Sequence, residues 1–212
     1  MRTLSRELPA LLGLVLLAVS GCGDPAPAVA DPPGTVTVVV VGDSITEMDS
    51  PDFDDGQIGP GSWAAHANGH GVHILGGWAH SGATTTDMLR GLATHDLQAD
   101  VLVILAGNND IDHGVSAPAI EDQLRQIAGR VRAHRVVLST VAPEDGVAAA
   151  VEELNSRLPA LARAQGWRLV DPMSAISDGH GHYLPGMTRD GVHPTPPAAR
   201  VIGEALHSAL VA

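Results

Sequence analysis

The stretch from Val36 to Thr46 constrains the fold more than any other part of the chain. Residues 36–41 read VTVVVV, a β-branched run without polar alternation, and they lead directly into Gly42, Asp43 and Ser44. Such a run is typical of a strand that is buried on both faces, as in the middle of a parallel sheet. In helix-covered parallel sheets, ligands bind at the carboxyl ends of the strands. Since Ser44 follows that end, we expect the functional site to gather around it.

The rest of the chain alternates expected strands with expected helices. Further strands are predicted at residues 72–75 (closed by a Gly-Gly pair), 101–105, 135–140 and 167–170. Helices are predicted at residues 63–68, 84–92, 118–133, 147–165 and from 196 onwards, with a kink or break at Pro159. This alternation predicts an α/β fold with a parallel sheet of about five strands that is flanked by helices.

The charge of the chain argues against nucleic acid as a partner. Its 12 cationic residues, all arginine, stand against 24 acidic residues, which gives a net charge of −12 over 212 residues. A surface this acidic repels nucleic acid and anionic membrane surfaces.

The acidic run 49–55 lacks an ordered calcium-ligand pattern, and His180 and His182 have no further ligand at zinc-like spacing. We therefore expect that the protein needs no metal and no cofactor.

The N-terminal segment resembles a bacterial lipoprotein signal. Arg2 and Arg6 precede an apolar run, Leu8 to Val19, that is too short to span a bilayer comfortably. The single cysteine, Cys22, follows small residues as in a lipobox. This resemblance implies cleavage before Cys22 and attachment of lipid to it. The alternatives are a secreted protein with a free cysteine and a retained N-terminal anchor.

The chain therefore divides into three parts. We expect a signal peptide over residues 1–21, a lipid-anchored tether rich in Pro and Ala over 22–34, and a single folded domain over 35–212. We expect that domain to be a monomer.

Side chains suited to ester chemistry follow the expected strands. Ser44 comes after the first strand, Gly82 after the second, Asn109 after the third, and Asp190 with His193 after the fifth. A serine hydroxyl needs an adjacent base, which His193 can supply, and Asp190 can accept the other N–H of the imidazole. The backbone N–H groups of Ser44 and Gly82 and the side-chain amide of Asn109 can donate to an oxyanion.

Four blocks in this order resemble the SGNH hydrolases, the GDSL-type esterases and lipases. The blocks are Gly42-Asp43-Ser44, Ser81-Gly82-Ala83-Thr84, Gly107-Asn108-Asn109-Asp110, and Asp190 with His193. The resemblance covers most of the domain. It implies the roles given above and a three-layer, flavodoxin-like sheet with strand order 2-1-3-4-5. One departure is that His80 and Ser81 stand where the family often carries an asparagine before the glycine of the second block.

The predicted function is extracytoplasmic hydrolysis of short acyl esters, with an O-acetyl group on a glycan as one candidate substrate. An O-acyltransferase on the same residues and a non-catalytic, glycan-binding surface lipoprotein are the alternatives.

Asp43 and Asp110 are expected to hydrogen-bond loop amides. Trp63 and Trp78 are candidates to line an acyl or sugar pocket, with core packing as the alternative for Trp63.

Overall fold

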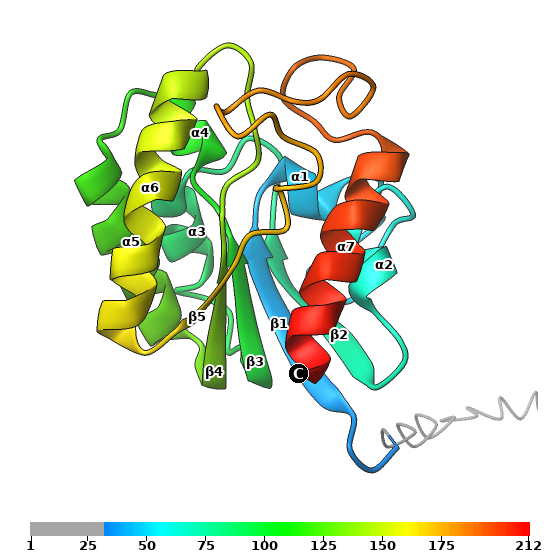
Figure 1. Ribbon diagram of the computed structural model, residues 1–212. Helices are drawn as coiled ribbons and strands as arrows, with labels where there is room; N and C mark the ends of the chain where they lie inside the picture. Colours follow the sequence, from blue (N-terminus) through cyan, green and yellow to red (C-terminus); the bar gives the residue numbers. More distant parts are fainter. Residues whose placement is uncertain (1–31) are drawn as a thin grey trace, which may run out of the picture. The chain divides into compact units, whose positions relative to one another are not determined.

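A five-stranded parallel sheet forms the centre of the computed structural model, which describes residues 32–212 (Figure 1). Its strands are β1 (Val36–Gly42), β2 (Val72–Ala79), β3 (Gln98–Leu105), β4 (Arg132–Ser139) and β5 (Arg168–Val170). They pair in the order β2-β1-β3-β4-β5. This confirms the fold class and the strand order that the resemblance implied. The predicted signal peptide, Cys22 and the tether up to residue 31 lie outside the described residues.

Helices cover both faces of the sheet (Figure 1). One face carries α3 (Thr85–Gly91), α5 (Ala117–Arg130) and α6 (Ala148–Gln165), and the other carries α2 (Trp63–Ala67) and α7 (Pro196–Val211). Two short helices, α1 (Ser44–Glu47) and α4 (Asn108–Asp112), follow the carboxyl ends of β1 and β3. Among residues 32–212, no helix has the length and apolarity that crossing a bilayer requires.

The valine run of β1 is buried because both faces of the sheet are covered. Val39 and Val41 belong to the apolar cluster under α3, α5 and α6, whereas Val38 and Val40 belong to the cluster under α2 and α7. Successive side chains of a strand point to opposite faces, so only a run that is apolar at every position satisfies both clusters. The central position of β1 therefore follows directly from the sequence.

The prediction that β2 ends before Gly76 and Gly77 is wrong, because the strand continues to Ala79. The two glycines have positive φ angles of 102° and 150°. The register against β1 shifts between Val38 and Val40 at this point. A Cβ atom on Gly77 would lie 2.0 Å from the carbonyl oxygen of Val40. The glycine pair therefore allows an irregularity inside the strand and carries the chain on to the functional site.

Two further expectations differ from the structure. Helix α5 ends at Arg130 and β4 begins at Arg132, each three residues before the predicted boundary. Helix α6 continues through Pro159 without a break. Pro159 lies on the exposed face, where water can satisfy the carbonyl that loses its N–H partner, while Leu154 and Leu158 are fully buried. The packing of the opposite face therefore outweighs the local cost of proline.

Candidate active site

Ser44 is placed at the end of β1 by a tight turn and a helix cap. Asp43 is the N-cap of α1, and its Oδ1 accepts a hydrogen bond from the backbone N–H of Ile45 at 3.0 Å. Gly42 packs against Thr46, since a Cβ atom on the glycine would lie 2.4 Å from the threonine Oγ1. Ser44 is then the first residue of α1, and its side chain lines a cavity at the edge of the sheet.

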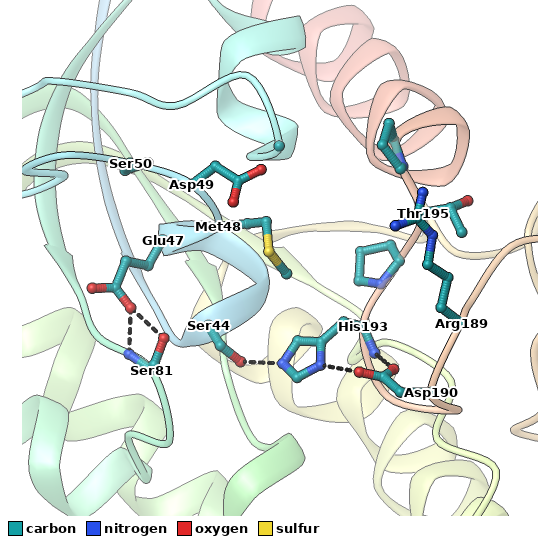
Figure 2. Close-up of a pocket in the computed structure, with 13 residues that line it drawn as sticks. Ser44, Glu47, Met48, Asp49, Ser50, Ser81, Arg189, Asp190, His193 and Thr195 are labelled. Atoms are coloured by element: carbon teal, nitrogen blue, oxygen red, sulfur yellow. Dashed lines mark hydrogen bonds and ion pairs between the residues drawn. The ribbon is translucent and has the colours of Figure 1, made fainter.

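Three side chains far apart in the sequence meet at this point (Figure 2). The Ser44 Oγ lies 3.0 Å from His193 Nε2. The other ring nitrogen, His193 Nδ1, lies 2.8 Å from Asp190 Oδ2. The sequence predicted that these residues converge, and the structure brings all three within hydrogen-bond distance. The arrangement is suited to moving a proton between a hydroxyl and an imidazole.

Asp190 is held as a carboxylate by the loop that carries it. Its Oδ1 accepts hydrogen bonds from the backbone N–H groups of Val192 at 3.0 Å and His193 at 2.8 Å. Partial burial acts to raise the pKa of Asp190, but the hydrogen bonds from His193 and Val192 outweigh it and lower that pKa below its usual range. The positive φ of 84° at Gly191 lets the loop turn between Asp190 and His193. An ionised carboxylate therefore faces the imidazole at neutral pH.

The two other predicted site residues, Gly82 and Asn109, lie close to each other, because Asn109 hydrogen-bonds the residue that follows Gly82. Gly82 lies in the exposed turn after β2, with a positive φ of 75°. The Asn109 Nδ2 donates to the carbonyl of Ala83, the next residue, at 3.0 Å. A side-chain amide has two hydrogens, so Asn109 keeps a second donor. Neither Gly82 nor Asn109 lines the cavity, although Ser81 does.

The cavity beside Ser44 has a volume of about 560 Å³. Its walls come from α1, the loop that follows α1, the turn after β2 and the segment that leads into α7. They include Glu47, Met48, Asp49, Ser50, Ser81, Arg189, Asp190, His193 and Thr195 (Figure 2). The acidic run 49–55 thus contributes Asp49 to the wall. Sequence reasoning did not identify Arg189 or Glu47, since neither belongs to a motif block.

Trp63 and Trp78 pack in the core and do not line this cavity. Trp63 is fully buried, and its indole N–H donates to Thr46 Oγ1 at 3.0 Å. The indole of Trp78 packs so closely on Gly91 of α3 that a Cβ atom there would collide with it. Of the two alternatives that the sequence left open for Trp63, the structure supports core packing, and the prediction that Trp78 lines the pocket is wrong.

Two buried carboxyl groups, those of Asp43 and Asp110, are next in sequence to the predicted site residues Ser44 and Asn109. Burial raises the pKa of Asp43 to about 7, and its Oδ2 has no hydrogen-bond partner among the described residues. Asp110 accepts hydrogen bonds from the backbone N–H and the hydroxyl of Thr85 at 2.9 and 2.6 Å. Asp43 and Asp110 therefore bond backbone amides, as the sequence predicted. Within residues 32–212, no group of three or more His, Cys, Asp or Glu side chains is arranged to hold a metal ion.

Glu144 provides a pH-dependent contribution to stability. Burial, followed by the neighbouring carboxyl of Asp112, raises the pKa of Glu144 above its ordinary value of 4.5. An acid whose pKa rises on folding stabilises the fold fully below its unfolded pKa, and this contribution is lost as the pH rises through the folded pKa. Glutamine at this position cannot ionise but keeps an oxygen for Asn108, which donates to Glu144 at 3.2 Å.

We therefore expect Glu144→Gln to gain thermal stability relative to the unsubstituted protein as the pH rises from about 5 to about 8. The expected change in the Tm difference is about 2–4 °C, which corresponds to about 1 kcal/mol in a domain of this size. Thermal melts of both proteins at the two pH values measure it. A Tm difference that does not vary with pH would contradict the prediction.

Comparisons with known proteins agree with the geometry. Residues 40–201 match the model of a family described as the GDSL-like lipase/acylhydrolase family. A search of curated proteins gave no match. Solved structures with the same fold include a variant of an acetyl xylan esterase from Geobacillus stearothermophilus, at 20% identity and a TM-score of 0.70, with 84% of this chain and 95% of the other covered.

Two other solved structures share the fold at similar distance. The native aryl esterase of M. smegmatis is 21% identical with a TM-score of 0.63, over 83% of this chain and 98% of that one. A protein of the G-D-S-L family from Desulfitobacterium hafniense DCB-2 is 18% identical with a TM-score of 0.65, over 82% and 99% of the two chains. At these identities the likeness establishes the fold.

Proposed function

Because the chain belongs to the GDSL-like lipase/acylhydrolase family and is an SGNH-type serine ester hydrolase, we propose that Ser44, His193 and Asp190 perform its reaction. The observation that carries this proposal is the 3.0 Å separation between the Ser44 Oγ and His193 Nε2. Asp190 orients the imidazole and stabilises the imidazolium that forms when the ring accepts a proton.

The reaction proceeds in two halves. His193 removes the proton of Ser44 while the Oγ attacks the ester carbonyl carbon, and the carbonyl oxygen becomes an oxyanion. The backbone N–H groups of Ser44 and Gly82 and the amide of Asn109 donate to that oxyanion. The C–O bond to the alcohol then breaks, and His193 returns the proton to the departing alkoxide. In the second half water, deprotonated by His193, attacks the acyl-enzyme, and Ser44 leaves with the proton.

The substrate of this reaction is an ester of a short acyl group. The cavity of about 560 Å³ has polar side chains from Ser50, Asp49, Arg189 and Thr195 in its walls, and the apolar side chains that could hold a long acyl chain are limited to Met48, Pro194 and Pro196. Two proteins of the same fold are named as an acetyl xylan esterase and an aryl esterase. Both observations support short acyl esters, and the polar walls also suit a hydroxyl-rich alcohol such as a glycan.

A series of p-nitrophenyl esters of increasing acyl length tests this specificity. We expect kcat/KM to be highest for acetate or butyrate and to fall at least about 10-fold by octanoate, because Met48, Pro194 and Pro196 offer a longer chain little apolar surface to bury against. A rise in kcat/KM up to octanoate and beyond would contradict the short-acyl proposal and indicate a lipase.

The location of the enzyme is a separate proposal that rests on the sequence. The apolar run before Cys22 and the small residues that precede it support an extracytoplasmic lipoprotein anchored through this cysteine. Such an anchor would hold a monomeric domain near the membrane without charge attraction to lipid headgroups. Mass spectrometry of the N-terminal peptide isolated from cells tests this, since an unmodified cysteine or an intact residue 1 would exclude lipidation.

A further inference from the structure

The carboxylate of Glu47 joins two parts of the site that lie 34 residues apart. Its Oε2 accepts a hydrogen bond from the backbone N–H of Ser81 at 2.6 Å and another from the Ser81 hydroxyl at 2.5 Å (Figure 2). Hydrogen bonds to a charged acceptor are shorter and stronger than those between neutral groups. One oxygen atom thus fixes both polar hydrogens of Ser81.

Both ends of this contact are next to residues that the proposed reaction uses. Glu47 is the last residue of the short helix α1, whose first residue is Ser44. Ser81 directly precedes Gly82, so the peptide bond between them carries the Gly82 N–H. A carboxylate on the nucleophile's helix therefore holds the residue that sets the direction of the proposed oxyanion donor.

The other side of the same turn is held from α4. The backbone N–H of Ala83 donates to the His80 carbonyl at 3.1 Å, which closes the turn. The Ala83 carbonyl accepts from Asn109 Nδ2 at 3.0 Å. Residues 80–83, which we name the oxyanion turn, are thus attached to α1 through Glu47 and to α4 through Asn109. These contacts connect the elements that carry all three proposed oxyanion donors.

We propose that Glu47 is a positioning residue, which keeps the Gly82 N–H aligned with the oxyanion that forms at Ser44. This inference rests on the proposed function, because it concerns the donor geometry of that reaction. The effect belongs to the transition state, where the negative charge develops, and so it changes kcat more than KM. An exposed polar contact adds little to global stability, so the Tm stays nearly unchanged.

Steady-state kinetics of Glu47→Ala on p-nitrophenyl acetate test the proposal. We expect kcat to fall about 10-fold, less than the roughly 10²–10³ of a whole oxyanion donor, because the Gly82 N–H is misaligned and not removed. KM should stay within about twofold and the Tm within about 2 °C. Labelling by a fluorophosphonate probe should slow in parallel, since its phosphoryl oxygen occupies the same donors.

Two further variants separate positioning from other effects. Glu47→Gln keeps an acceptor oxygen for Ser81 and should restore kcat to within about threefold of the unsubstituted enzyme. Adding Ser81→Ala to Glu47→Ala should cost less than the product of the two single losses, because both act through one contact. Asp55→Asn is the matched control, since it removes one charge from an exposed neighbouring residue that does not line the cavity.

Three results would overturn the proposal: unchanged kcat in Glu47→Ala, an equal loss in Glu47→Gln, or fully multiplicative losses in the double variant. Failure of the proposed function would look different. In that case Ser44→Ala would retain turnover and probe labelling, whereas a failure confined to the role of Glu47 leaves the loss in Ser44→Ala intact.

Discussion

Replacing Ser44 with alanine is expected to lower kcat by on the order of 10⁴–10⁶ and to abolish labelling by a fluorophosphonate probe. The hydroxyl that lies 3.0 Å from His193 Nε2 is the only group that we propose to form the acyl-enzyme. Without it, water must attack the ester directly, and only the oxyanion donors and substrate binding remain to assist. The fold should be unaffected, because within residues 32–212 the Ser44 hydroxyl hydrogen-bonds only His193, and it lies at the cavity surface.

A second serine, Ser208, serves as the control for Ser44 in the labelling experiment. Ser208 of α7 is exposed, and within residues 32–212 its hydroxyl donates only to the carbonyl of Glu204, at 2.9 Å. Ser208→Ala should therefore keep both turnover and labelling. If Ser44→Ala were labelled at the rate of the unsubstituted protein, Ser44 would not be the nucleophile, and the mechanism proposed above would be wrong.

The convergence of Ser44, His193 and Asp190 could be predicted because each depends on local sequence. A β-branched run predicts a buried strand, and a glycine after it predicts a turn at the strand's carboxyl end. Parallel strands bring all such ends to one edge. The three-residue spacing between Asp190 and His193 places the acid beside the imidazole within a single loop, and the structure has them 2.8 Å apart.

Features that depend on contacts between distant segments could not be predicted in this way. Gly76 and Gly77 look like a strand end, but the close approach of Val40 on β1 makes them an irregularity within β2. The contact between Glu47 and Ser81 joins helix α1 to the turn after β2, and no local sequence pattern predicts that these two segments lie side by side. The sequence alone does not indicate a role for Glu47, because that role depends on Ser81, which only the folded structure brings next to it.

Replacing Asn109 with alanine is expected to lower kcat by roughly 10²–10³, the usual effect of removing one oxyanion donor, with little change in KM. The ground-state carbonyl bears little charge, so the amide contributes mainly when the oxyanion forms. Loss of the 3.0 Å bond to the Ala83 carbonyl adds to the effect, because it frees one side of the oxyanion turn. Steady-state kinetics on p-nitrophenyl acetate measure both parameters.

Two comparisons decide whether this loss comes from the amide donor. Asn109→Asp preserves the shape but removes both N–H donors at neutral pH, so its kcat should fall at least as far as that of the alanine variant. His113→Ala alters the same short segment, where the exposed imidazole hydrogen-bonds the backbone carbonyl of Asn109 at 2.6 Å, and should keep kcat within about threefold. A loss of only a few fold in Asn109→Ala would remove this residue from the oxyanion hole. The backbone N–H groups of Ser44 and Gly82 would then be the remaining proposed donors.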